Sequence, residues 1–439
     1  MNAATFPGGI HPAYHKQLAD QAATETLPPP AEAVVPVAQH IGAPAKAVVK
    51  KGDEVKVGQV IAEAAGFVSV PIHAPLSGKV VAVEPRHHPM GKKLESIVIA
   101  NDGADEWAAP MEPLSVEQAG REALVNRIRD AGIVGMGGAT FPTHVKLSPP
   151  PGKSIDTVIL NGAECEPFLT ADHRLMVEDP ERVVDGLQIV RSILGAQRAM
   201  IGVEENKPDA LRALQKAASG KGIDVVPLEV KYPQGAEKQL IDALLHRQVP
   251  TGGLPMDVRV VVQNVGTAKA VAEAVREGKP LIERVTTVTG SIVTKPKNLS
   301  IRVGTPVSEA IEACGGLTND PVKLICGGPM MGMAQHNDLV PVIKGTSGIL
   351  LLGADDVSRE PEGACIRCGA CVRGCPMNLR PTELNSLSEA GLFAEAEQED
   401  ALDCIECGCC SWSCPARLML VQRIRHAKSQ IMAARRKQG

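Results

Sequence analysis

Short apolar segments alternate with longer amphipathic segments between residues 155 and 278. The apolar segments, such as IDTVIL, RAMIGV and VRVVVQN, are rich in Val and bounded by turn residues, which is typical of buried parallel strands. The segments between them repeat apolar residues at helical spacing; in the first, one stripe contains Val183, Leu187, Val190 and Leu194. The pattern predicts a parallel α/β sheet, and such sheets bind ligands at the carboxyl ends of their strands.

Two β-rich patterns flank this region. Residues 43–85 contain short strand-like segments with turns at glycines, and resemble the barrel-sandwich of biotinyl and lipoyl carriers. The hairpin tip of that region, AAGFVSV, lacks the lysine that carries a prosthetic group, so we predict a docking or packing role. We expect the nearby histidines to face solvent and not to bind metal; these are His73, His87 and His88. Residues 285–330 have the pattern strand, strand, helix, strand.

Composition narrows the class of protein. The chain has 439 residues, which suggests three or four domains, and a net charge of −4, which gives no general attraction to nucleic acid or anionic lipid. No segment approaches the ~20 apolar residues of a membrane helix, and the first residues lack the pattern of a signal peptide. We therefore expect a soluble cytoplasmic chain. In a reducing compartment, its 12 cysteines indicate metal or redox chemistry.

Nine of these cysteines lie between Cys365 and Cys414, in CIRCGACVRGCP and CIECGCCSWSCP. Both segments have the spacing CxxCxxCxxxCP, in which three thiolates bind one [4Fe-4S] cluster and the fourth binds the other. We assign one cluster to Cys365, Cys368, Cys371 and Cys414, and the second to Cys404, Cys407, Cys410 and Cys375. A zinc site would use two CxxC pairs separated by a longer loop and closed by four ligands, but two complete ferredoxin segments disfavour it. The other four, Cys165, Cys314, Cys326 and Cys409, are expected to be buried apolar residues.

The segments around the cysteines read as helices. Leucines between the two cysteine segments recur among polar residues, so we predict a helical ferredoxin-type module. Residues 417–439 combine an apolar stripe with many Arg and Lys residues. This basic helix either lies on an anionic membrane or an acidic partner, or packs on the cluster module with its basic face exposed.

A glycine-rich loop, GIVGMGGATFPTHVKL, precedes the first predicted strand of the sheet. It lacks the Lys-Ser/Thr end of a P-loop, which disfavours a triphosphate with magnesium. Its glycines allow the backbone to approach a planar ring and a single phosphate, with Lys146 as a counter-charge. The segment LNGAECEPFLTADHR begins within that first strand and runs on beyond it, so the two segments can face one crevice.

The glycine loop is similar to the flavin loop of the NADH- and FMN-binding subunit of respiratory complex I. Along nearly its whole length the chain resembles the C-subunit family of the Rnf (Rsx) electron-transport complexes, through FPGGIHP, NGAECEP, YPQGAEKQL, VQNVGTAKAV, CGGPMMG and both cysteine segments. The resemblance implies an NADH-oxidising subunit of an ion-translocating complex, with FMN and two [4Fe-4S] clusters. It also implies a peripheral place on the cytoplasmic face of the bacterial inner membrane, with a ferredoxin-like B subunit and integral membrane subunits as partners.

The same resemblance implies the residues of the site. Around the flavin and its phosphate it places Gly135, Gly137, Gly138 and Lys146. Along the flavin and nicotinamide crevice it places Asn161, Glu164, Glu166, Tyr232, Gly235, Glu237, Asn264 and Thr267, with the carboxylates of Glu164 and Glu166 in the catalytic role. The alternative for these two is a solvated or helix-capping carboxylate. The chain departs from its complex I relative at Ala163, where that relative has an aspartate, and at Thr140, which replaces a glycine.

The expected architecture is α/β and multidomain. We predict a barrel-sandwich domain over 1–110, a Rossmann-like FMN- and NADH-binding domain over 111–282, a β-grasp (SLBB) module over 283–354 and a two-cluster ferredoxin-type domain over 355–439. Two other functions share part of these features. One is a soluble flavin and iron–sulfur reductase, similar to cobalamin reductase, and the other is an electron-wiring adaptor without flavin.

Overall fold

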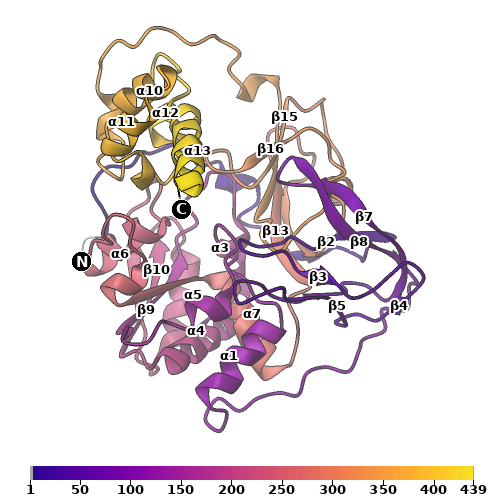
Figure 1. Cartoon of the computed structure of the whole chain (residues 1–439). Helices are drawn as coiled ribbons and strands as arrows, with labels where there is room; N and C mark the ends of the chain where they lie inside the picture. The colour runs from indigo at the N-terminus through magenta and orange to yellow at the C-terminus, as the bar shows by residue number, and fades with distance from the viewer. Residues whose placement is uncertain (1–2, 439) are drawn as a thin grey trace.

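The structure is a computed structural model that describes residues 3–438, and it contains the four predicted kinds of unit (Figure 1). The α/β unit has a four-stranded parallel sheet in the order β11-β10-β9-β12. Its strands are β9 (Thr157–Gly162), β10 (Arg198–Glu204), β11 (Asp224–Leu228) and β12 (Val260–Asn264). Its helices are α1 (Arg121–Asp130), α2 (Thr143–Lys146), α3 (Ala171–Glu178), α4 (Pro180–Leu194), α5 (Pro208–Ala218), α6 (Glu237–Leu245) and α7 (Val265–Arg276). The sequence pattern predicted these strands and the last four helices, but not α1, α2 or α3.

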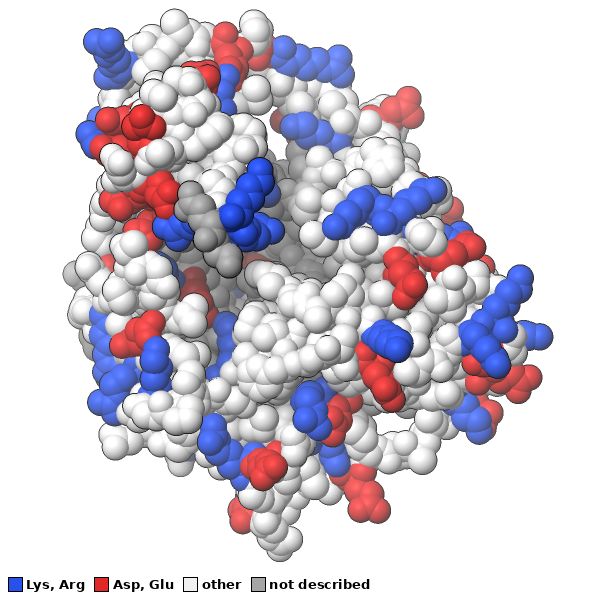
Figure 2. Space-filling view, viewed as in Figure 1, with Lys and Arg blue, Asp and Glu red and all other residues white. Residues whose placement is uncertain are grey.

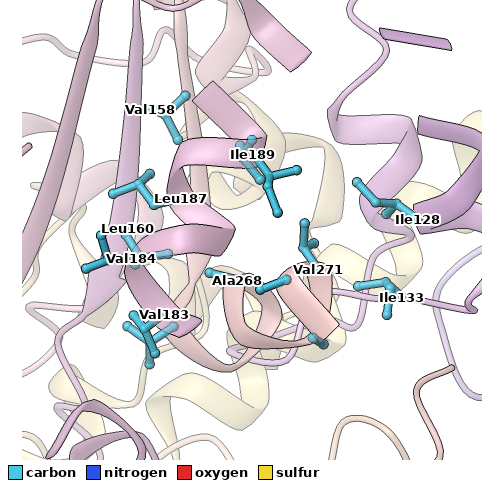
Figure 3. Packing of buried hydrophobic residues seen from close by; sticks show 14 of the residues in the cluster. Ile128, Ile133, Val158, Leu160, Val183, Val184, Leu187, Ile189, Ala268 and Val271 are labelled. Carbon is cyan, nitrogen blue, oxygen red and sulfur yellow. The ribbon is translucent and has the colours of Figure 1, made fainter. Parts of the chain in front are cut away.

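Helix α4 shows how the amphipathic pattern becomes a core. It begins at Pro180, whose ring suits the first helical position, and Gly195 follows its end with a φ of 61°. Its apolar stripe packs on β9 and on α7; in Figure 3, Leu187 lies beside Leu160 of β9, and Val271 of α7 belongs to the same cluster. At Gly186 a Cβ atom would lie 1.9 Å from the carbonyl oxygen of Ala268, so the close packing of α4 on α7 requires glycine there.

The N-terminal β unit consists of two small sheets. One has the order β2-β8-β7-β4 and the other β3-β5-β6. The strands are β2 (Glu32–Pro36), β3 (Lys46–Ala47), β4 (Glu54–Val55), β5 (Val60–Glu63), β6 (Ile72–His73), β7 (Gly78–His88) and β8 (Lys92–Asn101). The hairpin tip is fixed to α2, since the Phe67 carbonyl oxygen lies 2.9 Å from Nε2 of His144. The expectation that the nearby histidines face solvent is wrong for His73 and His88, which are buried at the ends of β6 and β7.

A six-stranded mixed sheet forms the β-grasp unit. Its order is β1-β14-β13-β17-β15-β16. Its elements are β13 (Glu283–Thr289), β14 (Lys297–Arg302), α8 (Val307–Ala313), β15 (Lys323–Cys326), β16 (Met333–Gln335) and β17 (Gly348–Leu352). The edge strand β1 (Glu25–Thr26) comes from the N-terminal segment, which also runs along the α/β unit, where Ala4 pairs with Leu228 and Ile10 with Tyr232. Residues 3–31 therefore join units and form no strand of the barrel.

Short helices build the C-terminal unit, at the upper left of Figure 1. They are α9 (Ala370–Arg373), α10 (Pro381–Glu389), α11 (Phe393–Gln398), α12 (Cys409–Trp412) and α13 (Leu420–Gln438). The helical segment predicted between the cysteine segments is present, but Gly391, with a φ of 70°, divides it. The apolar stripe of α13 is buried on the module, at Leu420, Ile424, Ala427 and Ile431. Of the two alternatives for the basic helix, the structure shows packing on the cluster module.

Charge on the surface is mixed. Figure 2 shows basic and acidic side chains interspersed over one face, in keeping with the small net charge. Several basic residues of α13 form ion pairs with the module, including Arg435 with Glu397 and Lys428 with Glu406. Among residues 3–438, no helix is both long enough and apolar enough to cross a membrane.

Candidate functional site

Two asparagines mark the carboxyl edge of the parallel sheet. Asn161 is the penultimate residue of β9 and lies beside Asn264, which ends β12; the two are direct partners in the strand register. Nδ2 of Asn161 donates a hydrogen bond of 2.8 Å to the Gly235 carbonyl oxygen. Oδ1 of Asn264 accepts from the amides of Gly266 and Thr267, which caps α7. Both predicted asparagines therefore hold backbone segments at the edge where such sheets bind ligands.

The glycine loop runs along this same edge. The Met136 amide donates to Oγ1 of Thr267 at 2.9 Å, and Gly137 packs so tightly that a Cβ atom would lie 2.8 Å from Nδ2 of Asn264. Gly138 is exposed, with open space where a Cβ would be. In the part of the chain that the structure describes, the amides of Gly137, Gly138 and Ala139 form no hydrogen bond. Three free amides beside open space fit a bound anionic group.

Thr140 takes a backbone conformation that favours glycine. Its φ is 52°, in the left-handed region, and this is the position where the complex I relative has glycine. Its methyl group packs beside Gly345 of the β-grasp unit, where a Cβ on that glycine would lie 2.5 Å away. Thr140 thus takes a backbone conformation typical of glycine and adds a contact between two units.

Lys146 lies at the end of α2, and its ammonium group is already paired. Nζ is 2.8 Å from Oε1 of Glu237 and donates to the Val262 carbonyl oxygen at 3.3 Å. The pair is partly exposed, with 30% and 37% of the two side chains accessible. The structure therefore brings Lys146, Glu237 and the middle of β12 together. The role of Lys146 toward a phosphate stays a prediction.

Of the two candidate catalytic carboxylates, Glu164 is buried and Glu166 is partly buried, and both accept hydrogen bonds from backbone amides. Glu164 accepts hydrogen bonds from the amides of Asp172 and His173, so it caps the start of α3. This is the helix-capping alternative for Glu164, and burial raises the pKa of its carboxyl group. Glu166 accepts from the amides of Met330 and Met331 in the CGGPMMG turn of the β-grasp unit. A role of either carboxylate toward NADH stays a prediction.

We predict a pH-dependent stability term from Glu166. Burial raises the pKa of this carboxyl group to about 7, above its unfolded value near 4.5. The folded chain therefore binds more protons than the unfolded chain between these two values, and the free energy of unfolding falls as the pH rises through this range. The term is on the order of 3 kcal/mol. Glu166→Gln should remove it, because an amide stays neutral.

Urea unfolding of the wild type and of Glu166→Gln, at about pH 5 and at about pH 8, measures the difference. The exposed Glu205→Gln changes the same charge without this burial and serves as the control. Equal pH dependence in the wild type and in Glu166→Gln contradicts the prediction.

Three buried cations hold these segments, and sequence reasoning missed them. Nη2 of Arg284, on β13, donates to the Met136 carbonyl oxygen at 2.7 Å. Nζ of Lys344 donates to the Gly132 carbonyl oxygen at 2.7 Å, and burial lowers the pKa of Lys344 to about 7. Lys16 donates to the carbonyl oxygens of Glu166 and Leu169. The only sequence signal was a charged residue inside an apolar segment, as in LIERVTTV.

The eight predicted cluster ligands fall into two sets around two cavities. The first cavity, of about 520 Å³, is lined by Cys365, Cys368, Cys371 and Cys414. The second is lined by Cys375, Cys404, Cys407 and Cys410, together with Cys409. Each set contains three cysteines of one segment and the last cysteine of the other, as the crossed assignment requires.

The arrangement of the thiols suits clusters. Within the described residues, no three His, Cys, Asp or Glu side chains lie close enough together to hold one metal ion. Four thiols spread around one cavity instead fit a [4Fe-4S] cluster, which is held by four cysteine thiolates. Burial raises the pKa of Cys404 to about 11 and that of Cys410 to about 12, so iron must displace the thiol protons.

The second thiol set is joined to the crevice loops. Tyr232, only 1% exposed, donates a hydrogen bond of 2.8 Å from its hydroxyl group to the Cys407 carbonyl oxygen. It packs in one buried cluster with Cys165, Cys407 and Cys409. Sγ of Cys165 in turn accepts a hydrogen bond from the Gly235 amide. Tyr232 therefore does not line an open crevice but connects the crevice segments to the cluster module.

Each unit matches a known domain family. Residues 4–104 match the RnfC barrel sandwich hybrid domain, residues 128–273 the Nuo51 FMN-binding domain, residues 285–334 the SLBB domain and residues 364–419 a 4Fe-4S dicluster domain. These matches confirm the predicted fold class. They also place the glycine loop and the strand edge within a family described as FMN-binding.

Three relatives align with nearly the whole of this chain. The chain is 52% identical to the C subunit of the proton-translocating ferredoxin:NAD(+) oxidoreductase complex of Clostridium ljungdahlii, over 98% of this chain and 94% of the relative. It is 48% identical to the C subunit of the Na(+)-translocating complex of Acetobacterium woodii, over 99% and 98%. It is 46% identical to the C subunit of the ion-translocating oxidoreductase complex of Rhodobacter capsulatus, over 97% and 82%. The chain therefore belongs to the family of C subunits of Rnf-type ion-translocating oxidoreductase complexes.

Proposed function

We propose that this chain is the electron-input subunit of a membrane-bound, ion-translocating ferredoxin:NAD(+) oxidoreductase complex. Its relatives carry that activity in their names, and its domains match FMN-binding and 4Fe-4S dicluster families. One observation carries the proposal for this chain: the carboxyl edge of the sheet, with its free loop amides, is joined through Tyr232 and Cys407 to the second of two sets of four thiols. When bound, FMN exchanges a hydride with NADH and single electrons with iron–sulfur clusters.

We assign separate roles to the loop amides, the two asparagines and the two thiol sets. The amides of Gly137, Gly138 and Ala139 would hold the flavin phosphate or ring edge at the sheet edge. Asn161 and Asn264 fix the segments around it through their backbone hydrogen bonds. Each thiol set would hold one cluster, and the buried second set lies on the crevice side. In the first set, Cys365 and Cys368 are exposed, which places that set on the solvent side.

We also propose where the chain sits. It would be peripheral, on the cytoplasmic face of the bacterial inner membrane, beside integral membrane subunits that move the ions. A ferredoxin-like B subunit would exchange electrons with it. The support is the membership of the relatives in ion-translocating complexes, as their names state.

Tyr232→Phe tests the connection between crevice and cluster module. The change removes the hydrogen bond to the Cys407 carbonyl oxygen and keeps the ring, so we expect a loss of about 0.5–1.5 kcal/mol in the free energy of unfolding. Flavin affinity should stay the same, while reduction of the clusters by NADH should slow, because the second thiol set loses its anchor. Stopped-flow absorbance separates flavin bleaching from cluster reduction. Tyr14→Phe also removes a hydroxyl-to-carbonyl bond, to Val230, and is the matched control. An unchanged rate of cluster reduction in Tyr232→Phe contradicts the prediction.

Anaerobic reconstitution of the full chain tests the function itself. The proposal expects about eight irons per chain, bound flavin, and bleaching of flavin and clusters after NADH is added. Eight irons without flavin would instead identify the electron-wiring adaptor. Bound flavin that NADH does not reduce would contradict the electron-input role.

A further inference from the structure

The first thiol cavity opens directly to solvent. Cys365 and Cys368 are exposed, and Ile366 between them has 68% of its surface accessible. On the neighbouring helix α9, Val372 is 40% exposed. Ile366 and Arg367 lie in the lining of the first cavity, and Val372 directly follows Cys371 of the same lining. We call the surface formed by Ile366, Arg367, Val372 and Arg373 the exit rim.

The exit rim carries an excess of positive charge. Among residues 3–438, the arginines of the exit rim form no salt bridge, and Arg373 donates only to the Cys368 carbonyl oxygen, at 3.1 Å. The acidic residues nearby in sequence are already paired. These pairs are Glu360 with Arg417, Glu362 with Arg423, and Glu383 with Arg380. Arg367 and Arg373 are therefore the charges left to interact with another molecule.

We propose that the exit rim is the docking surface for an acidic iron–sulfur electron carrier. This inference rests on the proposed function, since it gives the first thiol set its exchange partner. A small apolar centre with charged neighbours suits a transient redox encounter, which buries little surface and is steered by complementary charge. Only one electron crosses such an interface, in either direction, so no bond forms or breaks. Oxidised carrier accepts the electron and reduced carrier supplies it.

Binding to the cluster-loaded full chain tests the proposal with a defined probe. The probe is a small acidic bacterial ferredoxin with two [4Fe-4S] clusters, and basic cytochrome c of similar size is the reversed-charge control. We expect ferredoxin to bind and its dissociation constant to rise roughly tenfold between about 20 mM and about 200 mM salt. Cytochrome c should bind far more weakly. Equal binding of ferredoxin and cytochrome c to the wild-type chain would by itself overturn the proposal.

Charge reversal then locates the surface. Arg367→Glu with Arg373→Glu should weaken ferredoxin binding roughly tenfold at low salt. Arg212→Glu with Lys216→Glu changes the net charge equally on the exposed face of α5 and should leave binding within about twofold. Arg367→Lys with Arg373→Lys keeps the charge and should keep most of the binding. Unchanged binding in the reversed rim, or equal loss in the α5 control, would overturn the assignment.

The outcomes are separable from those of the proposed function. Ferredoxin binding requires neither NADH nor flavin, so failed reduction by NADH with normal, rim-dependent binding would contradict only the electron-input role. Normal reduction by NADH with rim-independent binding would contradict only the exit rim. Binding of anionic lipid vesicles that the rim charges control, without ferredoxin binding, would identify a membrane contact and overturn the carrier proposal.

Discussion

Cys375→Ala is expected to remove the cluster held by the second cysteine segment and to spare the cluster held by the first. The thiol of Cys375 lines the cavity of Cys404, Cys407 and Cys410, although it lies in the segment that begins at Cys365. With one of four ligands missing, that cavity cannot close around a [4Fe-4S] cluster, so iron should fall from about eight to about four per chain. The converse change, Cys414→Ala, should remove the other cluster.

Electron paramagnetic resonance of the reduced variants identifies which cluster is lost. Cys375→Ala should lack the same signal as Cys404→Ala, and Cys414→Ala the same signal as Cys365→Ala. Cys326→Ala, in the β-grasp unit, changes a cysteine outside both cavities and should keep both signals. If Cys375→Ala instead loses the signal that Cys365→Ala loses, each segment ligates its own cluster and the crossed assignment is wrong.

Alanine substitutions at two neighbouring glycines of the loop are expected to have different effects on stability and on flavin affinity. Gly138→Ala adds a methyl group in open space, so the flavin-free chain should keep its thermal midpoint. If that space holds flavin, the methyl group meets the ligand and affinity falls roughly tenfold or more. Gly137→Ala places its Cβ against Asn264, the residue that caps α7. It should therefore cost about 1–3 kcal/mol in stability as well as flavin affinity.

Fluorescence titration of FMN and thermal unfolding of the flavin-free chain measure the two effects separately. Gly120→Ala, at the start of α1, also adds a methyl group in open space and should change neither. Wild-type FMN affinity in Gly138→Ala would show that the loop does not hold the flavin. Unchanged stability in Gly137→Ala would show that the loop can move away from Asn264 at little cost.

Much of the fold follows from local sequence spacing. The stripe of Val183 and Leu187 predicts α4 because apolar residues three and four apart share one helix face. Helix α3 was missed because its cap is not local: Glu164 accepts from its first amides across a loop, at a separation of 8 and 9 residues. Helix α1 has few apolar residues and is set by its packing on the α/β core.

The candidate site, like the fold, was predicted from the sequence only in part. Cysteine spacing alone predicted both thiol sets, because a turn of fixed geometry determines which thiols can share a cluster. The sequence also placed the glycine loop and Asn161 near one edge, because carboxyl ends of parallel strands meet there. The burial of Tyr232, by contrast, depends on a partner 175 residues away, and sequence spacing carries no information about such a distance.

The sequence by itself determined the chemistry that the chain can hold and the kinds of domain that hold it, since thiol spacing and strand patterns act over a few residues. Only the tertiary structure decided how the domains constrain the site. Arg284 and Lys344 of the β-grasp unit hold the glycine loop, and Glu166 holds the turn of that unit in return. The physical reason is burial: charges and carbonyl groups removed from water must find partners, and here the partners lie in other domains.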